Sequence, residues 1–284
     1  MVEPIGLIAG AGRLPELVAE NAVAAGRDVT VVRLAGMADG SLEQFNGREI
    51  QLGALQEVIS TFRDNGCVEL SFAGKVQRPD FANLGLDELA MTHLPQLVSA
   101  ASQGDDALMR AVGDVFEAEG FRIVGLGEIA RELLCPAGIV GGAAVSPEMV
   151  KDLSKAFDIA GLIGNRDIGQ GCIVCDGLVL AVEAQEGTNA MLERIQLLPE
   201  DVRGTPQRRR GVLVKRSKPG QDLRMDLPVV GLETFERAAM AGLAGIGLEA
   251  ERSILVDRVD LALKAEEFGV AIIGLGADGQ VPQS

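Results

Sequence analysis

The chain has 284 residues, of which 47% are hydrophobic and 24% charged, and a formal net charge of -15; this composition excludes a disordered chain and predicts a folded protein with a large core. The acidic balance and the absence of Trp and Tyr exclude nucleic acid as a partner, because nucleic-acid binders use basic surfaces and aromatic stacking. His93 is the only histidine, which excludes a zinc site built on several histidines and leaves most acid, base and metal chemistry to carboxylates.

The first half of the chain alternates between strand-like and helix-like segments. The apolar run Ile5 to Ala9 leads through the glycine loop GAGRLP into a predicted helix, Glu16 to Ala25, and a second strand, Val29 to Leu34. The further predicted elements are a helix at Leu55 to Asp64, a strand at Val68 to Ala73, helices at Asp87 to Ala101 and Asp106 to Glu119, and a strand at Phe121 to Leu126. This order predicts an α/β fold with a Rossmann-like parallel sheet over residues 1–133.

The alternation breaks at the sequence LLCPAGIVGG, where proline and glycine predict a linker over residues 134–140. We expect a second α/β domain with a mixed sheet over residues 141–284. It opens with a helix that has Ser146 at its N-cap and Pro147 at its first position. The pair Asp176-Gly177 between two β-rich runs predicts a hairpin. The remaining predicted elements are the strands GVLVKR, VVG, SILVD and VAIIGLG and helices over 233–244 and 258–268.

The glycine loop offers the first candidate ligand contacts. Gly10 and Gly12 lie between a strand and a helix, so either an anion site at the helix N-terminus or a tight structural turn fits them. The loop is not the dinucleotide fingerprint, because a proline replaces its third glycine and the second strand ends without an acidic residue for a ribose. Lys75 follows the strand of residues 68–73, at the edge where α/β sheets bind ligands, and is either a phosphate partner or a solvated lysine.

Acidic and polar residues form further candidate sites along the chain. Asp105 and Asp106 precede a helix, where capping is the simpler interpretation and a metal or ribose contact the alternative. The sequence NRDIGQG contributes Asp167 and Gln170. In VEAQEGTNAML, Glu183 ends a strand and Glu186 leads into a helix that Thr188 can cap while it offers its hydroxyl to an anion.

A loop after the strand VLVKR collects the richest set of charges. The residues are Lys215, Lys218, Gln221, Asp222, Arg224 and Asp226. Eight of the 26 Lys and Arg residues lie between Arg203 and Arg224, so an acidic protein carries one basic region suited to an anionic ligand. Asp222, Asp226 and Glu186 offer the hard oxygen ligands that Mg²⁺ prefers, while Lys215 and Arg224 can neutralise phosphoryl oxygens.

These motifs closely resemble the bacterial UDP-2,3-diacylglucosamine pyrophosphohydrolases of lipid A biosynthesis, in the family unrelated to the metallophosphoesterases that catalyse the same step. The resemblance spans nearly the whole chain. It rests on GLIAGAGRLP, on GKV at Gly74, GDDAL at Gly104, DIGQ at Asp167 and EGT at Glu186, and above all on VKRSKPGQDLRMDLP from Val214.

The resemblance implies a Mg²⁺-dependent hydrolase that cleaves a lipid-linked UDP-sugar to UMP and 2,3-diacylglucosamine 1-phosphate, with water attacking the β-phosphorus. It also implies a homodimer with its substrate enclosed between two domains. The catalytic residues are expected to be Asp226, Asp222, Glu186 and Lys215, with the first three as metal ligands. The expected substrate contacts are Gly10, Gly12, Lys75, Asp105, Asp106, Asp167, Gln170, Thr188, Gln221 and Arg224.

The location is expected to be cytoplasmic, because no stretch reaches the length of a membrane span and the N-terminus lacks the basic region of a signal peptide. Membrane contact is then at most peripheral, at the inner face of the inner membrane. The small apolar run of residues 241–248 has two interpretations, a groove for acyl chains or ordinary packing. Two other functions remain open: an NAD(P)-linked oxidoreductase, and a non-catalytic protein that binds a nucleotide sugar or lipid.

Overall fold

A computed structural model describes residues 3–77, 80–81 and 84–282 of the chain. The chain forms two compact units. The first contains Met1–Arg131 and the short segment Asp222–Asp226, and the second contains Glu132–Gln221 and Leu227–Ser284. The first unit therefore includes five residues from the C-terminal half of the sequence.

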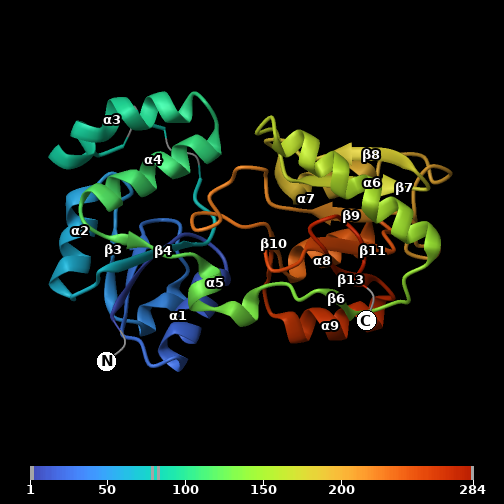
Figure 1. The fold of residues 1–284 in the computed structure, drawn as a ribbon, viewed down its shortest axis with the longest axis horizontal. Helices are drawn as coiled ribbons and strands as arrows, with labels where there is room; N and C mark the ends of the chain where they lie inside the picture. Colours follow the sequence, from blue (N-terminus) through green and yellow to red (C-terminus); the bar gives the residue numbers. More distant parts are fainter. Residues whose placement is uncertain (1–2, 78–79, 82–83, 283–284) are drawn as a thin grey trace. The chain divides into compact units, whose positions relative to one another are not determined.

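The first unit is built on an all-parallel sheet with the strand order β3-β2-β1-β4-β5, of which β3 and β4 are labelled in Figure 1. Its strands are β1 (Ile5–Ala9), β2 (Val29–Leu34), β3 (Gly47–Ile50), β4 (Glu69–Ala73) and β5 (Arg122–Ile123). Its helices are α1 (Leu14–Ala24), the 3-10 turn η1 (Gly40–Gln44), α2 (Leu55–Asp64), α3 (Glu88–Ala101), α4 (Asp105–Ala118) and α5 (Leu126–Ile129). A second 3-10 turn, η2 (Arg131–Leu133), follows at the boundary with the second unit.

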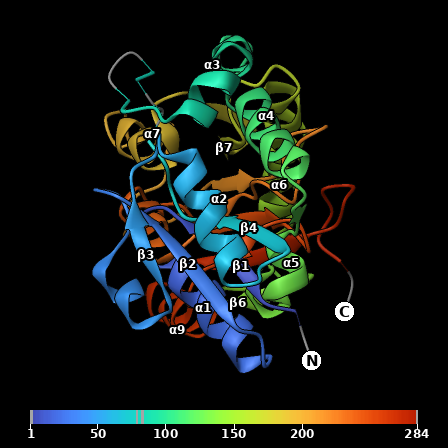
Figure 2. The ribbon, with the colours of Figure 1, turned by 90° about the vertical axis from the view of Figure 1, so that its left-hand side faces the viewer.

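The core of the first unit lies on both faces of this sheet. Ile8, Val32 and Leu70 form one buried cluster with Phe62 of α2 and Phe116 of α4. Because successive residues of a strand point to opposite faces, their neighbours point to the other face, where α1 contacts β1, β2 and β4. Figure 2 shows α2 in front of the strands. The parallel sheet is therefore covered on both sides, as parallel sheets require.

The second unit is built on a six-stranded mixed sheet with the order β6-β13-β11-β9-β7-β8. Strands β9, β11 and β13 run parallel, whereas β6 and β7 are antiparallel to their neighbours. The strands are β6 (Gly138–Gly141), β7 (Gly171–Cys175), β8 (Leu178–Val182), β9 (Val212–Lys215), β11 (Gly245–Glu249) and β13 (Ala271–Leu275), with a separate parallel pair β10 (Val229–Val230) and β12 (Ile254–Leu255). The helices are α6 (Pro147–Gly164), α7 (Gly187–Ile195), α8 (Leu232–Met240) and α9 (Arg258–Phe268).

Each face of the mixed sheet has its own core. On one face, Phe157 of α6 packs with a cluster that includes Val214 of β9. On the other face, Met191 of α7 and Phe235 of α8 belong to a cluster with Ile173 of β7 and other inward-facing strand residues. Helix α6 thus covers one face, and α7 to α9 cover the other.

The predicted α/β class, with a parallel first sheet and a mixed second sheet, is confirmed. The hairpin at Asp176-Gly177 is also confirmed: β7 and β8 pair in antiparallel fashion, and both turn residues have positive φ, at 49° and 79°. These are the angles of the tight turn that favours Asp-Gly. The helix after Ser146 has the predicted cap, since the Ser146 hydroxyl accepts from the Met149 amide at 3.2 Å.

Several predicted boundaries are wrong. The strand expected at Phe121 to Leu126 pairs with β4 only over Arg122–Ile123, because the chain soon turns into α5, which begins at Leu126. The run of residues 241–248 contains most of β11, a fully buried central strand, so packing is its role and the acyl-groove interpretation is wrong. The last three residues of the expected linker, 138–140, form the edge strand β6 together with Gly141. None of the helices in the described part of the chain is long and apolar enough to cross a bilayer.

Candidate functional site

In the first unit, the glycine loop and Lys75 meet at the carboxyl edge of the parallel sheet. Ala11 and Lys75 exchange two backbone hydrogen bonds of 2.9 Å, which hold the loop containing Gly10 and Gly12 beside the exposed Lys75. The Gly12 amide donates to Asp39 Oδ2 at 2.9 Å. Asp39 was not predicted from the sequence, because it lies in the loop beyond β2. The dinucleotide-binding fingerprint has its acidic residue at the end of the second strand instead.

Asp105 and Asp106 form the first turn of α4. Gly104, which has no side chain, is the N-cap residue, so the prediction that one of the two aspartates stands before the helix as its cap is wrong. Both carboxylates still lie where the helix dipole favours negative charge. Asp106 also pairs with Arg110, one turn later, at 2.5 Å.

The segment Asp222–Asp226 forms a single helical turn within the first unit. The amides of Met225 and Asp226 both donate to the Asp222 carbonyl, at 2.9 and 3.3 Å. The Asp222 carboxylate accepts from the Arg224 amide at 3.0 Å and from its guanidinium at 2.7 Å. The hydrogen bond from Arg224 holds the pKa of Asp222 below its usual value although partial burial opposes it. Asp222 is thus a paired carboxylate, and Asp226 lies exposed at the end of the same turn.

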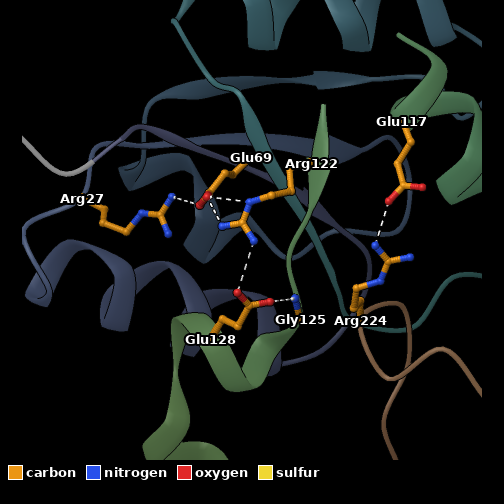
Figure 3. A network of polar contacts seen from close by, with 7 residues as sticks. All are labelled: Arg27, Glu69, Glu117, Arg122, Gly125, Glu128 and Arg224. Carbon is orange, nitrogen blue, oxygen red and sulfur yellow. Dashed lines mark hydrogen bonds and ion pairs between the residues drawn. The ribbon is translucent and has the colours of Figure 1, made fainter. Parts of the chain in front are cut away.

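Two further contacts fasten this turn to α4, and Figure 3 shows the first of them. Arg224 Nη1 pairs with Glu117 Oε1 at 2.7 Å. Met225 is only 6% exposed and belongs to the core cluster of the first unit. It packs against Gly113, where an added Cβ would lie 3.2 Å from the Met225 sulfur. A glycine inside a helix costs stability, and here it makes room for the side chain that anchors the turn.

In the second unit, Lys215 lies at the carboxyl end of β9 and is only 5% exposed. Its ammonium donates to the Val229 carbonyl at 3.3 Å, and no carboxylate within the described residues forms an ion pair with it. A buried ammonium without a carboxylate partner is costly, because burial removes the water that would solvate its charge. The position therefore fits an anionic ligand.

A buried pair lies on the same face of this sheet. Glu183 directly follows β8 and is 6% exposed, and Thr188, the second residue of α7, is 8% exposed. The Thr188 hydroxyl donates to Glu183 Oε1 at 2.6 Å. The expectation that Thr188 caps α7 is wrong, because the helix begins at Gly187, after Glu186 as N-cap residue, and the hydroxyl is engaged by Glu183.

The other predicted site residues of this unit are engaged with neighbours. Glu186 is exposed and pairs with Arg194 at 2.7 Å. Asp167 pairs with Lys218. The amide of Lys218 donates to Gln221 Oε1 at 2.9 Å. Gln170 differs, since its side-chain carbonyl oxygen is buried without a hydrogen-bond partner among the described residues.

A cavity of about 320 Å³ lies elsewhere, at the amino end of the first sheet. Figure 3 shows the ion pairs around it: Glu69 binds Arg27 and Arg122, and Arg122 also binds Glu128. Burial alone raises the pKa of Glu69, but the hydrogen bonds from both arginines outweigh it and leave the pKa lowered. Because these charges satisfy one another, and because ligands bind at the opposite, carboxyl edge of such sheets, the network stabilises the fold.

The three expected metal ligands are divided between the units. Asp222 and Asp226 belong to the first unit, and Glu186 belongs to the second. Within residues 3–77, 80–81 and 84–282, no group of three or more His, Cys, Asp or Glu side chains is arranged to hold a metal ion.

Comparison with known proteins covers both halves of the chain. Residues 4–133 match the family model of the LpxI N-terminal domain, and residues 136–273 match that of the LpxI C-terminal domain. A protein of Caulobacter vibrioides described as UDP-2,3-diacylglucosamine pyrophosphatase LpxI is 48% identical over 271 residues, which covers 95% of this chain and 97% of that protein.

The anchoring of the turn Asp222–Asp226 is testable by truncating its buried side chain. We expect Met225→Ala to remove about 2–5 kcal/mol of packing free energy and to speed hydrogen exchange in peptides that cover the turn and α4. Met91→Ala is the matched control, since Met91 is 62% exposed. Equal exchange in the two variants would show that Met225 does not hold the turn.

Proposed function

The chain belongs to the LpxI family, and from this membership we propose that it is a Mg²⁺-dependent hydrolase of UDP-2,3-diacylglucosamine. The products are UMP and 2,3-diacylglucosamine 1-phosphate, with water attacking the β-phosphorus. Support comes from the 48% identity to a protein with the corresponding description, and from a match that extends over both domains.

The buried ammonium of Lys215 is the structural observation that carries this proposal. It lies at the carboxyl end of a parallel strand, the edge at which α/β sheets bind ligands. Among the described residues it makes a single hydrogen bond, to Val229, which leaves N–H donors for a further acceptor. A phosphoryl oxygen of the substrate supplies both an acceptor and the negative charge, and Lys215 then stabilises charge that develops during hydrolysis.

Asp226 is the second residue that this proposal requires. The turn that carries it is fixed by Met225 and by the Arg224–Glu117 ion pair, so the Asp226 backbone is held in place before substrate binds. A carboxylate held in this way can orient the attacking water or bind a metal, and such positioning contributes much of the rate in phosphoryl transfer.

Mg²⁺ suits the donor set because it accepts one or two carboxylates and completes its coordination with water and substrate phosphate. Asp226 and Asp222 share one turn and would supply carboxylates, although Asp222 is already paired with Arg224. Glu186, the third expected ligand, belongs to the second unit, where Arg194 engages it. When bound, the ion polarises phosphoryl oxygens and lowers the pKa of a coordinated water.

The substrate contacts and assembly that the resemblance implies are also part of this proposal. The glycine loop with Lys75 lies at a sheet edge of the first unit that suits a nucleotide sugar, and in the second unit Gln170 directly precedes β7 while Thr188 lies in the first turn of α7. We include the homodimer, the cytoplasmic location and a peripheral contact with the membrane.

The reaction itself is the first test. Purified protein incubated with UDP-2,3-diacylglucosamine and Mg²⁺ should release UMP and the sugar 1-phosphate, both visible by phosphorus NMR. Excess EDTA should stop the release and added Mg²⁺ should restore it, because the pyrophosphate needs its charge neutralised. Substrate left intact with Mg²⁺ would refute the hydrolase proposal, and full turnover in EDTA would refute the metal requirement.

The second test concerns Asp226. We expect Asp226→Ala to lower kcat on the order of 10²-fold or more and to leave the folded state intact, since Asp226 is exposed. Asp114→Ala is the matched control, because Asp114 is an exposed aspartate of the same unit, on α4. If both variants turn over at similar rates, Asp226 has no catalytic role.

A further inference from the structure

The direction of one hydrogen bond limits what Thr188 can bind. A threonine hydroxyl has a single proton, and in this structure it is donated to Glu183 Oε1. The hydroxyl oxygen therefore faces any further ligand as an acceptor. Phosphate oxygens are acceptors too, so the partner of Thr188 must be either a hydrogen-bond donor or a cation.

The second oxygen of Glu183 points to the same kind of partner. Glu183 is only 6% exposed, and its Oε2 atom is buried without a hydrogen-bond partner within the described residues. An ionised carboxylate oxygen in this position costs free energy until a donor or a cation reaches it. Two hard oxygens, Thr188 Oγ1 and Glu183 Oε2, thus lack an electropositive partner at one place.

The register of the sheet places Lys215 in line with Glu183, across strand β7. The Glu183 amide donates to the Gly171 carbonyl at 2.8 Å, and Gly171 is the direct partner of Lys215 in the next strand pair. Directly opposed residues of neighbouring strands point to the same face of the sheet. Helix α7 covers this face, because Ala181 and Ile173, each two residues away along its strand and so on the same face, pack with Met191 of α7.

Gly171 matters because it lacks a side chain. A Cβ at this position would lie 2.6 Å from Glu183 Oε2, so only a glycine permits the carboxylate to lie over β7 between its own strand and Lys215. The exposed turn of Gln185 and Glu186 directly precedes α7, so solvent reaches the chain segment that joins Glu183 to Thr188.

We propose that Glu183 and Thr188 form a binding site for a divalent cation in the second unit, and that Lys215 binds the phosphate that accompanies the ion. A threonine early in a helix, a strand-end carboxylate and a lysine are the groups that hold Mg²⁺ and phosphates in P-loop enzymes. That likeness concerns the chemistry of the groups and not the fold. The inference rests on the proposed function only in naming a pyrophosphate as the anion.

The site differs from the predicted trio of metal ligands in a way that an experiment can separate. Asp222 and Glu186 are already neutralised by Arg224 and Arg194, whereas Glu183 Oε2 has no such partner in the part of the chain that the structure describes. Two protein oxygens are enough for Mg²⁺, which keeps several waters and takes the rest of its ligands from substrate.

The test uses Mn²⁺ as a paramagnetic substitute and the full-length protein. Free Mn²⁺ is measured by electron paramagnetic resonance during titration of the protein at millimolar metal, without substrate. We expect Glu183→Gln and Thr188→Val to weaken Mn²⁺ binding by about 10-fold or more, and Thr188→Ser to retain it because the hydroxyl is kept. Glu193→Gln is the matched control, since Glu193 lies exposed on the same helix and pairs with Arg237.

Two results would overturn the inference: Mn²⁺ binding to Glu183→Gln as tight as to wild type, or no Mn²⁺ binding by the wild type. Loss of binding only in Asp226→Asn or Glu186→Gln would place the ion with the predicted trio instead. Thermal unfolding of each variant identifies a loss caused by misfolding, and Thr188→Val, which is isosteric, then decides the outcome. Because the readout is metal binding, it is independent of turnover: a wild type that binds Mn²⁺ through Glu183 but releases no UMP would refute only the proposed function.

Discussion

The burial of Met225 in the core of the first unit is the contact on which the arrangement of the candidate catalytic residues depends. It places the turn Asp222–Asp226 in that unit, although the chain on either side belongs to the second unit. The chain passes from one unit to the other at residues 131–132, 221–222 and 226–227. Asp226 is therefore held by the first unit, whereas Lys215, Glu183 and Thr188 are held by the second.

Both sheets present their candidate ligand contacts at the carboxyl ends of parallel strands. In the first sheet these are the glycine loop and Lys75, joined by the paired backbone of Ala11 and Lys75. In the second sheet the candidate is Lys215, at the end of β9. This agrees with the general rule for open α/β sheets, in which loops at that edge carry the function and the strands hold them rigidly.

Local chemistry explains which parts of the fold were predictable from sequence. The Asp176-Gly177 hairpin and the Ser146 cap were predictable because backbone angles and a side-chain acceptor determine them within a few residues. Strand β11 was missed because its sequence, GIGLE, is rich in glycine and buried on both faces, so it lacks the alternation that identifies a strand. The edge strand β6 was taken for a linker because its pairing with β13 is a long-range contact that no local pattern reveals.

The candidate site was predictable to a similar extent. The residue types were recognisable from the motifs, but the division of Asp226 and Lys215 between two units depends on Met225, an ordinary apolar residue in the sequence. Glu183 was passed over as the end of a strand, and only its burial and its bond to Thr188 distinguish it. The proposed reaction requires that water attacks the β-phosphorus of the substrate. Single turnover in ¹⁸O-labelled water, followed by mass spectrometry of both products, tests this most directly: the label should enter the phosphate of 2,3-diacylglucosamine 1-phosphate, and label in UMP would contradict the account.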